Sequence, residues 1–248
     1  MQNIYKKKIA SLFSLVNFKK VFGNRIFTYH SINKEKNLTT SKIYQLDKNL
    51  FFKHIKLLTD NKANFQFINN FDNTRSNYLI TFDDGFKNFK LDVVDFLFEK
   101  KIPCTIFLSP DLIKSNNNNY LNINDLKELS KNNFIKIGSH SYNHKKLTEY
   151  NDKDLDFQLE TSKKWIEDTI SKKVNLISYP FGAFDNRVLK KVKKFGYEYG
   201  FTTRFNFYNN SNDKLRIPRI DIWDTDNVKI FKSKIDGKWN WMRFFSKY

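Results

Sequence analysis

Short apolar runs alternate with longer amphipathic segments along most of this chain. Seven runs are typical of strands, because they are rich in β-branched and aromatic residues and end at polar or turn residues; they cover residues 25–32, 77–84, 103–109, 134–140, 176–182, 199–205 and 216–222. Between them, five segments predict helices: 48–60, 86–101, 124–132, 152–170 and 185–196. Strands and helices in alternation indicate an α/β fold with a parallel sheet, and seven strands favour a barrel over an open sheet.

Polar residues gather where several of these strands end. The second strand ends in Asp83 and Asp84, which are followed at once by Gly85. Other strand ends carry "YH" at 29–30, "GSHSYNH" at 138–144, "YPFG" at 179–182 and "PRID" at 218–221. In a parallel barrel the carboxyl ends of the strands meet on one rim, where catalytic residues collect. We therefore expect these side chains to share one site.

The two adjacent carboxylates and two histidines predict a metal site. His140 and His144 are four residues apart and can grip one ion if the loop turns helically. With Asp84 they would form a site of two histidines and one carboxylate that leaves positions open. Asp83 would then lie beside the metal as a general base. In the alternative, Asp83 caps the helix that begins near Gly85 and Asp84 is merely exposed.

Composition limits the partners. The 248 residues are 40% hydrophobic and 17% aromatic, which is ample for a buried core. The single cysteine, Cys104, lies in an apolar run and is expected to be a buried residue without a disulfide. A net charge of +18 favours an anionic partner, either nucleic acid or an anionic membrane. Because the lysines are scattered and no nucleic-acid motif is present, we do not expect nucleic-acid binding.

The two ends of the chain divide it into three parts. Residues 1–24 predict a basic amphipathic segment, 25–236 the main domain, and 237–248 a basic aromatic tail. The N-terminal apolar run, Ile9 to Val16, is too short to span a membrane. Both ends suit peripheral contact with an anionic membrane. We therefore expect a cytoplasmic protein at the inner membrane face, with export and simple packing of both ends on the domain as open alternatives.

Three motifs together carry a family resemblance. "TFDDG", "HSYNH" and "YPFG" resemble the polysaccharide deacetylases of the NodB-homology class, carbohydrate esterase family 4, and the similarity runs from "YHSI" to "IPRI". The resemblance implies a distorted (β/α)7 barrel of the NodB-homology type. It also implies that Asp83 is the base, and that Asp84, His140 and His144 bind Zn²⁺ or, alternatively, Fe, Ni or Co. The implied substrate is an N-acetylated amino sugar.

The chain departs from the family pattern in two places. Ser178 and Tyr179 stand where many members have an arginine, and no histidine follows His144 to act as the late catalytic acid. A subgroup that acts on surface poly-N-acetylglucosamine is similar in having an early "YH", whose histidine is the acid. His30 matches that histidine, with a buried structural role as its alternative.

Three further expectations concern single residues. Arg219 in "IPRI" is the arginine expected to orient the base, and a structural ion pair is its alternative. The backbone N–H of Phe181 in "YPFG" is expected to stabilise the developing oxyanion. His54 lies in the helical segment "FFKHIKLL" and is expected to be an ordinary surface or packing residue.

The predicted function is removal of the N-acetyl group from an amino sugar in a surface polysaccharide or its lipid-linked precursor. Three alternatives stay open: a sugar N-deformylase, a non-haem iron oxygenase, and a non-catalytic module that binds carbohydrate or nucleic acid. The oxygenases usually carry a closely spaced H-x-[DE] pair, whereas here the carboxylate precedes both histidines.

Overall fold

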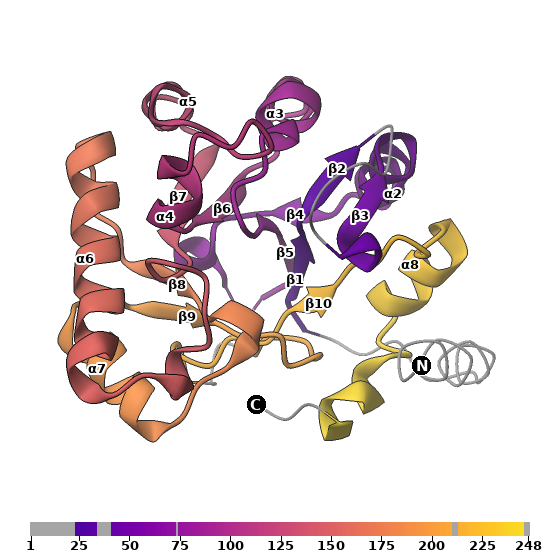
Figure 1. Cartoon of the computed structure of the whole chain (residues 1–248). Helices are drawn as coiled ribbons and strands as arrows, with labels where there is room; N and C mark the ends of the chain where they lie inside the picture. The colour runs from indigo at the N-terminus through magenta and orange to yellow at the C-terminus, as the bar shows by residue number, and fades with distance from the viewer. Residues whose placement is uncertain (1–22, 34–40, 73, 210–212, 246–248) are drawn as a thin grey trace.

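A curled parallel sheet forms the centre of the molecule (Figure 1). The structure, a computed structural model, describes residues 23–33, 41–72, 74–209 and 213–245. Seven strands follow the order β10-β1-β5-β6-β7-β8-β9, and every neighbouring pair is parallel. They are β1 (Arg25–Tyr29), β5 (Asn77–Phe82), β6 (Cys104–Leu108), β7 (Ile135–Ser139), β8 (Leu176–Ser178), β9 (Tyr199–Phe201) and β10 (Ile220–Asp221). A bridge between Phe201 and Ile217 brings the two outer strands toward each other.

Three short strands lie beside this sheet. β4 (Asn64–Phe65) pairs with the start of β5. β2 (Ser31–Asn33) and β3 (Gln45–Asp47) pair with each other in a separate parallel sheet. The segment predicted as one strand, 25–32, is therefore broken at His30, which leaves the sheet at the end of β1.

Helices cover the outside of the curled sheet (Figure 1). They are α2 (Lys48–Asp60), α3 (Val94–Glu99), α4 (Pro110–Lys114), α5 (Ile123–Leu129), α6 (Asp152–Ile170), α7 (Asn186–Lys194) and α8 (Val228–Ile235), with a π-helical turn (Phe89–Val93) before α3. Single-turn helices are η1 (Lys42–Tyr44), η2 (Ile68–Asn70), η4 (Leu147–Glu149), η5 (Pro180–Gly182) and η6 (Asn240–Phe245). The side chains of Asp47, Asn151 and Asp185 cap α2, α6 and α7. α2 and α6 have the predicted bounds, whereas α4 and α8 were not predicted.

Apolar side chains fill both faces of the sheet. On the inner face, β-strand residues form a cluster that includes Ile26, Leu79, Phe107, Leu176 and Phe201. On the outer face, alternate strand residues pack with the apolar sides of the helices. Gly138 makes the inner packing possible, since a Cβ there would lie 2.6 Å from the ring of Phe107. Cys104 is buried as predicted, and burial raises the pKa of its thiol.

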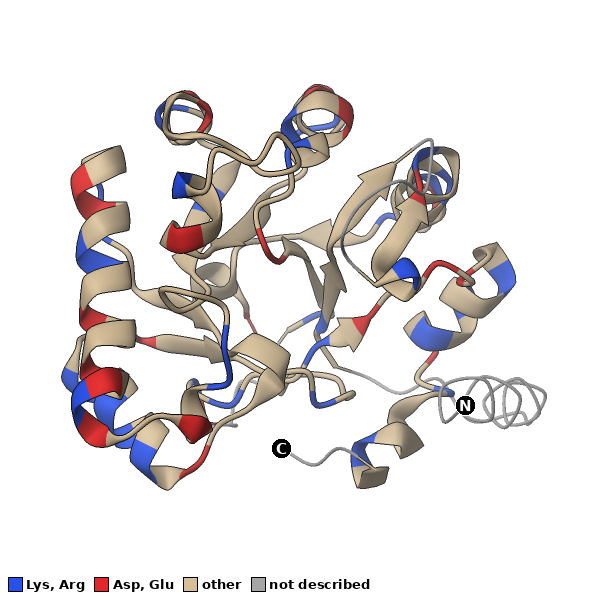
Figure 2. Cartoon of the chain, viewed as in Figure 1, with Lys and Arg blue, Asp and Glu red and all other residues tan. Residues whose placement is uncertain are grey.

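The parallel arrangement places the functional motifs on one rim. The register pairs Tyr29 with Phe82 and Leu108 with Ser139, so the residues that follow β1, β5 and β7 emerge together. Figure 2 shows an acidic segment at the middle of the barrel, in the loop after β5. No described helix has the length and apolar character that crossing a membrane would need.

Candidate active site

Asp83 and Arg219 form the central ion pair of the rim. The backbone N–H of Asp83 donates to Tyr29 O at 3.0 Å, which fixes the residue at the end of β5 beside β1. The Arg219 guanidinium donates to both carboxylate oxygens, from Nη1 to Oδ1 at 2.8 Å and from Nη2 to Oδ2 at 2.7 Å. Both side chains are buried. The structure therefore brings the expected base and its expected orienting arginine together in a bidentate pair.

Arg219 is itself held rigidly from several sides. Its Nε donates to Thr202 O at 3.0 Å, and its Nη1 also lies 3.2 Å from Thr81 Oγ1. The guanidinium carbon lies 5.6 Å from the centroid of the Phe107 ring and 5.9 Å from that of Phe201. Aromatic faces and fixed acceptors suit a planar guanidinium better than an ammonium group. The Arg219 guanidinium thus packs against the apolar residues inside the barrel, and its orientation is fixed.

Ser178 completes the ion pair and was not predicted to act there. Its hydroxyl donates to Asp83 Oδ2 at 3.1 Å and accepts from Arg219 Nη2 at 2.8 Å. In the sequence, Ser178 is distinguished only by standing where many family members have an arginine. The contact with Asp83 joins residues 95 positions apart, so no local pattern could have revealed it.

The electrostatic surroundings of Asp83 keep it ionised. Burial, the largest single effect, raises the pKa of Asp83, but the charge and hydrogen bonds of Arg219 together with the charges of His140 and His30 outweigh it, and the pKa is lowered to about 2. Asp83 therefore carries no proton at neutral pH and can accept one. The capping alternative is wrong for this residue, because its carboxylate bonds Arg219 and Ser178 rather than a helix N-terminus.

Asp84, His140 and His144 converge beside this pair. One ligand atom from each residue lies within 4.8 Å of the other two. Asp84 Oδ1 is 3.0 Å from His144 Nε2 and 3.5 Å from His140 Nε2. The two histidine rings have their centroids 4.8 Å apart. The structure thus brings together all three residues expected to bind a metal, and Asp84 is buried rather than exposed.

The chain adopts an unusual backbone to assemble this set. Asp84 has a φ of 72° and His144 a φ of 57°, values that residues other than glycine rarely adopt. Gly85 continues the turn with a φ of 73°, and its carbonyl accepts the N–H of Leu121 at 2.9 Å. Strained residues persist where their surroundings hold them, and they concentrate at functional sites. The turn after β5 directs Asp84 toward the histidines while Asp83 meets Arg219.

His140 is oriented for binding through one nitrogen. Its Nδ1 lies 2.8 Å from the backbone carbonyl oxygen of Ser178, an acceptor, so Nδ1 carries the proton. Nε2 is then left as the lone-pair nitrogen and faces Asp84. A metal-binding histidine usually donates its other N–H to such an acceptor.

The donor set fits a divalent cation. Asp84 Oδ1 is buried and makes no hydrogen bond with any described residue, despite its short distance to His144. A buried carboxylate oxygen without a hydrogen bond is unfavourable unless a cation compensates it. Burial raises the pKa of Asp84, yet both histidines counter it and the pKa is well below its usual value. One carboxylate oxygen and two imidazole nitrogens match the preferences of zinc and similar metals.

His30 lies on the same rim, against an aromatic ring and near a third carboxylate. It is half-buried after β1, and its ring centroid is 4.3 Å from that of Tyr44. Its Nδ1 is buried and makes no hydrogen bond with any described residue. Asp221, at the end of β10, interacts electrostatically with His30 and is the main cause that raises the pKa of Tyr44.

Asp221 is a second residue whose part in the site was not predicted. Burial raises its pKa, while the charges of His30 and Arg219 lower it, and the parallel register places Asp221 beside Thr28, two residues before His30. Its Oδ1 makes no hydrogen bond within the described part of the chain. The sequence signal for Asp221 is its place in "PRID", where it ends the last strand beside Arg219.

Phe181 and His54 occupy different places. Phe181 lies in η5 with φ 58° and ψ 13°, is 56% exposed, and has its ring centroid 5.1 Å from that of His144. Its ring therefore lies beside the ligand set, and the oxyanion role of its backbone N–H stays a prediction. His54 is fully buried on α2 and stacks on Phe231, so the surface alternative is wrong and the packing alternative is confirmed.

Comparisons with known proteins identify the family of this chain. The sequence pattern of the polysaccharide deacetylase family matches residues 72–200, more than half of the chain. A poly-beta-1,6-N-acetyl-D-glucosamine N-deacetylase of Staphylococcus aureus is 25% identical over 239 residues, covering 89% of this chain and 81% of that protein. YxkH of Bacillus subtilis, named as a candidate polysaccharide deacetylase, is 28% identical over 72% of this chain, which spans only 63% of the YxkH length.

A solved structure shows the same fold. The deacetylase PplD of Streptococcus pyogenes, in complex with acetate, matches with a TM-score of 0.76 at 18% identity, over 86% of this chain and 98% of that one. The chain therefore belongs to the polysaccharide deacetylase family, the NodB-homology class predicted from its motifs. Its curled parallel sheet is the distorted (β/α)7 barrel of that family.

Proposed function

We propose that this protein is a metal-dependent hydrolase that removes the N-acetyl group from an amino sugar in a surface polysaccharide or its lipid-linked precursor. One observation carries the proposal: Asp83 is ionised, held by Arg219, and lies with Oδ2 3.8 Å from His140 Nε2, beside the three converging ligands. An oriented base next to a cation site is the arrangement that amide hydrolysis needs. Zn²⁺ is the proposed ion, with Fe, Ni and Co as alternatives.

The ligand set and the base have separate tasks. A divalent cation held by Asp84, His140 and His144 would supply Lewis acidity, which acidifies water and polarises the amide carbonyl. Asp83 accepts the proton of the attacking water. Its Oδ2 already accepts hydrogen bonds from Arg219 and Ser178, whereas Oδ1 accepts only one strong bond and keeps a lone pair for that proton.

Two groups on the rim complete the reaction. The backbone N–H of Phe181 donates to the carbonyl oxygen as negative charge develops there. His30 gives a proton to the amide nitrogen, so that the sugar leaves as an amine. Asp221, whose carboxylate interacts electrostatically with His30, supports His30 in this role. What supports this assignment is that His30 is the remaining histidine on the rim and Asp221 is a carboxylate beside it.

The substrate class rests on a relative and on charge. The Staphylococcus aureus protein is named for poly-beta-1,6-N-acetyl-D-glucosamine, and this chain covers most of its length. The net charge of +18 additionally favours an anionic, lipid-linked sugar. An N-acetylated amino sugar is therefore the proposed substrate in both cases, either within a polymer or on its carrier.

Mass spectrometry of sugars incubated with zinc-loaded protein tests the proposal. We expect loss of acetyl groups and release of acetate from poly-β-1,6-N-acetylglucosamine oligomers or from lipid-linked N-acetylated sugars. Matched N-formyl sugars distinguish the deformylase alternative, since formate would then be released faster than acetate. An Asp83→Asn variant is the inactive control. Zinc-loaded protein that released acetate from none of these sugars would overturn the proposal.

A further inference from the structure

A buried lysine lies behind the rim, on the far side of Asp221. Lys234, near the end of α8, is fully buried, and its Nζ donates to the carboxylate of Asp226 at 2.5 Å. The same Nζ donates to the backbone carbonyl oxygen of Asp221 at 2.7 Å. One ammonium group thus joins both ends of the loop that leads from β10 toward α8.

Aromatic rings enclose this ammonium group. Nζ lies 4.0 Å from the centroid of the Trp223 ring, 5.0 Å from that of Trp239 and 5.6 Å from that of Phe205. Cation–π attraction contributes to holding a charge there, yet water is replaced by carbon on several sides. Burying an ion pair seldom stabilises a fold more than apolar residues of similar size would. The buried pair of Lys234 and Asp226 is thus explained better by the backbone that it positions than by a gain in the stability of the fold.

The loop that Lys234 fixes carries Asp221 at its start. The backbone N–H of Ile222 donates to Thr28 O at 3.0 Å, which attaches the same strand end to β1 two residues before His30. Trp223 donates its backbone N–H to Asp226 Oδ2 at 2.9 Å, so the loop is closed by the carboxylate that Lys234 binds. If the ammonium group moved, the backbone oxygen of Asp221 would lose this hydrogen bond, and the side chain of Asp221 would no longer be held in one direction.

We infer that Lys234 is a positioning residue, which holds Asp221 in the orientation that supports His30 during proton transfer to the leaving amine. The inference rests on the proposed function, because it assigns Lys234 to the acid side of that reaction. Lys234 is not one of the three converging ligands; its ammonium group holds the backbone carbonyl oxygen of Asp221, and its charge also lowers the pKa of that residue's carboxyl group.

The experiment needs a variant that folds. Lys234→Met alone would leave Asp226 as a buried charge without its cation, so the decisive variant combines Lys234→Met with Asp226→Asn, which removes both charges. Lys232→Met is the matched control, since Lys232 lies on the same helix and pairs with Asp236, but is exposed. Lys234→Arg alone tests whether a conservative cation rescues the function.

Steady-state kinetics on the N-acetylated sugar provide the first measurement. We expect the double variant to melt near the wild-type temperature and to lose about 10–100-fold in kcat with little change in KM, the range found for groups that orient catalytic residues. Lys232→Met keeps wild-type kinetics, and Lys234→Arg recovers part of the loss. Introduced into an Asp221→Asn background, the double substitution should cause no further loss. A wild-type kcat, or a loss that adds in full to that of Asp221→Asn, would overturn the inference.

Amide hydrogen exchange of Ile222 gives a readout that needs no activity. We expect its N–H to exchange faster in the double variant, while the N–H of His140, which donates to Leu108 O, exchanges as in the wild type. Unchanged exchange at Ile222 would overturn the inference even if kcat fell. If the wild type released no acetate while Ile222 exchange accelerated, the proposed function would fail and the anchoring by Lys234 would stand.

Discussion

At the scale of single residues, the two adjacent aspartates, Asp83 and Asp84, bind different partners. Asp83 meets a guanidinium and a hydroxyl, whereas Asp84 meets two imidazole nitrogens. A positive φ at Asp84 turns the two carboxylates apart, so that their charges are compensated by different partners. Because each carboxylate has its own partners, β5 can end in two like charges.

Substitutions at this pair should separate metal binding from turnover. Asp83→Asn should keep the metal content of the wild type and lose about 10²–10⁴-fold in kcat, because it removes the proton acceptor but none of the three ligands. Asp84→Ala, His140→Ala or His144→Ala should lower metal content and kcat together. Metal per chain and kcat, measured on the same preparations, check this. Loss of metal from Asp83→Asn, or no bound ion in the wild type, would contradict the assignment.

A second prediction concerns the acid and depends on the leaving group. His30→Ala should lower kcat by about 10²–10⁴-fold on an N-acetyl sugar, because an amine cannot leave without a proton. On an activated aryl ester the loss should be far smaller, since that leaving group departs as an anion. Parallel rates on both substrates measure the difference, with metal content as the control for an intact site. Equal losses on amide and ester would assign His30 to substrate binding instead.

Short spacing explains which site residues the sequence could predict. Asp83 and Asp84 are adjacent, and His140 and His144 are four residues apart, so each pair forms a motif that is visible without a fold. Ser178 could not be assigned to Asp83 from spacing, because a serine beside a strand has many possible partners. Arg219 was proposed from family resemblance and is found 136 positions along the chain from Asp83, at bonding distance.

At the scale of elements, α2 and α6 were easier to predict than α8. α2 and α6 each begin after a residue whose side chain accepts a backbone N–H, and their apolar faces run over 13 and 19 residues. α8 also begins after such a residue, Asn227, but its sequence "VKIFKSKI" is only eight residues long, which is too short for a helical period to be clear. Its buried lysine, Lys234, is stabilised only by tertiary contacts, which no local pattern records.

The packing of α2 against α8 predicts a pH-dependent stability. His54 donates from Nε2 to Asp226 O at 2.6 Å and accepts at Nδ1 from the Tyr29 hydroxyl at 3.3 Å, so it is a neutral ring. Burial lowers its pKa to about 4, although the bond to Asp226 partly opposes this. An unfolded histidine titrates near pH 6.5, so between about pH 6.5 and pH 4 the unfolded chain binds a proton that the native chain does not.

Stability should therefore fall as the pH drops through that window. The difference corresponds to about 3 kcal/mol in the free energy of unfolding at pH 4 relative to pH 7. Because His54→Gln cannot titrate, this variant should be less stable at pH 7 but lose less stability toward pH 4. Urea denaturation at several pH values measures both curves. Parallel curves for wild type and variant would show that His54 does not cause the effect.

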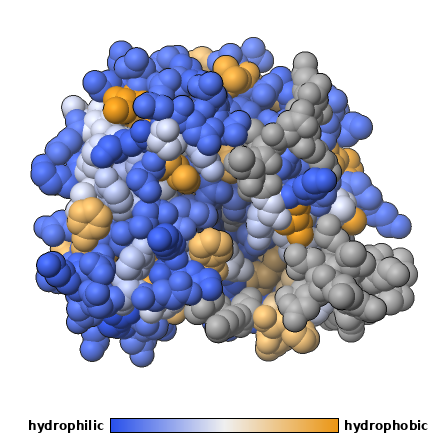
Figure 3. Space-filling view, in the orientation of Figure 1, coloured by the Kyte–Doolittle hydropathy of each residue, from blue (hydrophilic) through white to orange (hydrophobic). Residues whose placement is uncertain are grey.

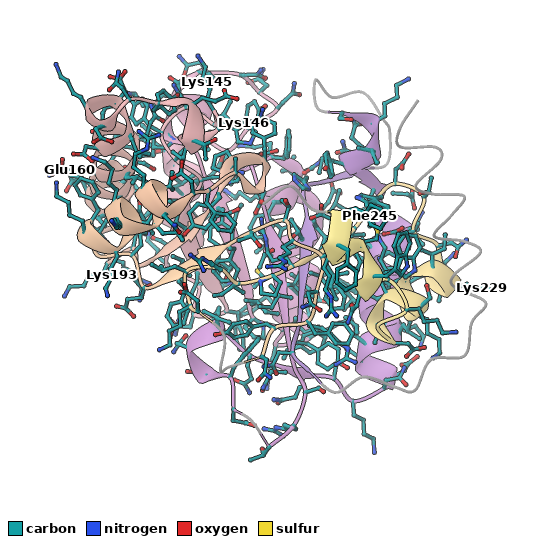
Figure 4. All side chains as sticks on the ribbon, turned by 90° about the horizontal axis from the view of Figure 1, so that it is seen from below. Lys145, Lys146, Glu160, Lys193, Lys229 and Phe245 are labelled. Atoms are coloured by element: carbon teal, nitrogen blue, oxygen red, sulfur yellow. The ribbon has the colours of Figure 1, made fainter. Side chains whose placement is uncertain are left out.

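At the scale of the whole molecule, the C-terminal tail divides into a buried and an exposed part. Trp239 is buried against Trp223 and Phe205, as the packing alternative requires. Phe244 and Phe245 are 74% and 69% exposed. Figure 3 shows an apolar patch where η6 lies, at the lower edge of this face. In Figure 4, Phe245 and Lys229 lie at one side of the molecule, away from Glu160 and Lys193 on the other. Residues 1–22 of the N-terminal segment lie outside the described structure.

The exposed part of the tail provides the test of the proposed membrane contact. Substituting Phe244→Ser together with Phe245→Ser should weaken binding to anionic vesicles by about tenfold or more, because aromatic side chains at the interface and nearby lysines act together. Raising the salt concentration should weaken the wild type further, since charges are screened beyond about 8 Å at physiological ionic strength. Co-sedimentation with phosphatidylglycerol vesicles measures both effects.

A matched variant decides whether the tail is specific in this role. Phe98 on α3 and Phe157 on α6 are 52% and 49% exposed, so Phe98→Ser together with Phe157→Ser removes two exposed aromatic side chains from other elements. It should leave vesicle binding at the wild-type level if the tail is the contact. Deleting residues 238–248 would be a poorer test, because it removes the buried Trp239 and disturbs the aromatic enclosure of Lys234. Equal binding to neutral and anionic vesicles, or equal losses from both sets of phenylalanine substitutions, would argue against an anionic membrane as the partner of this surface.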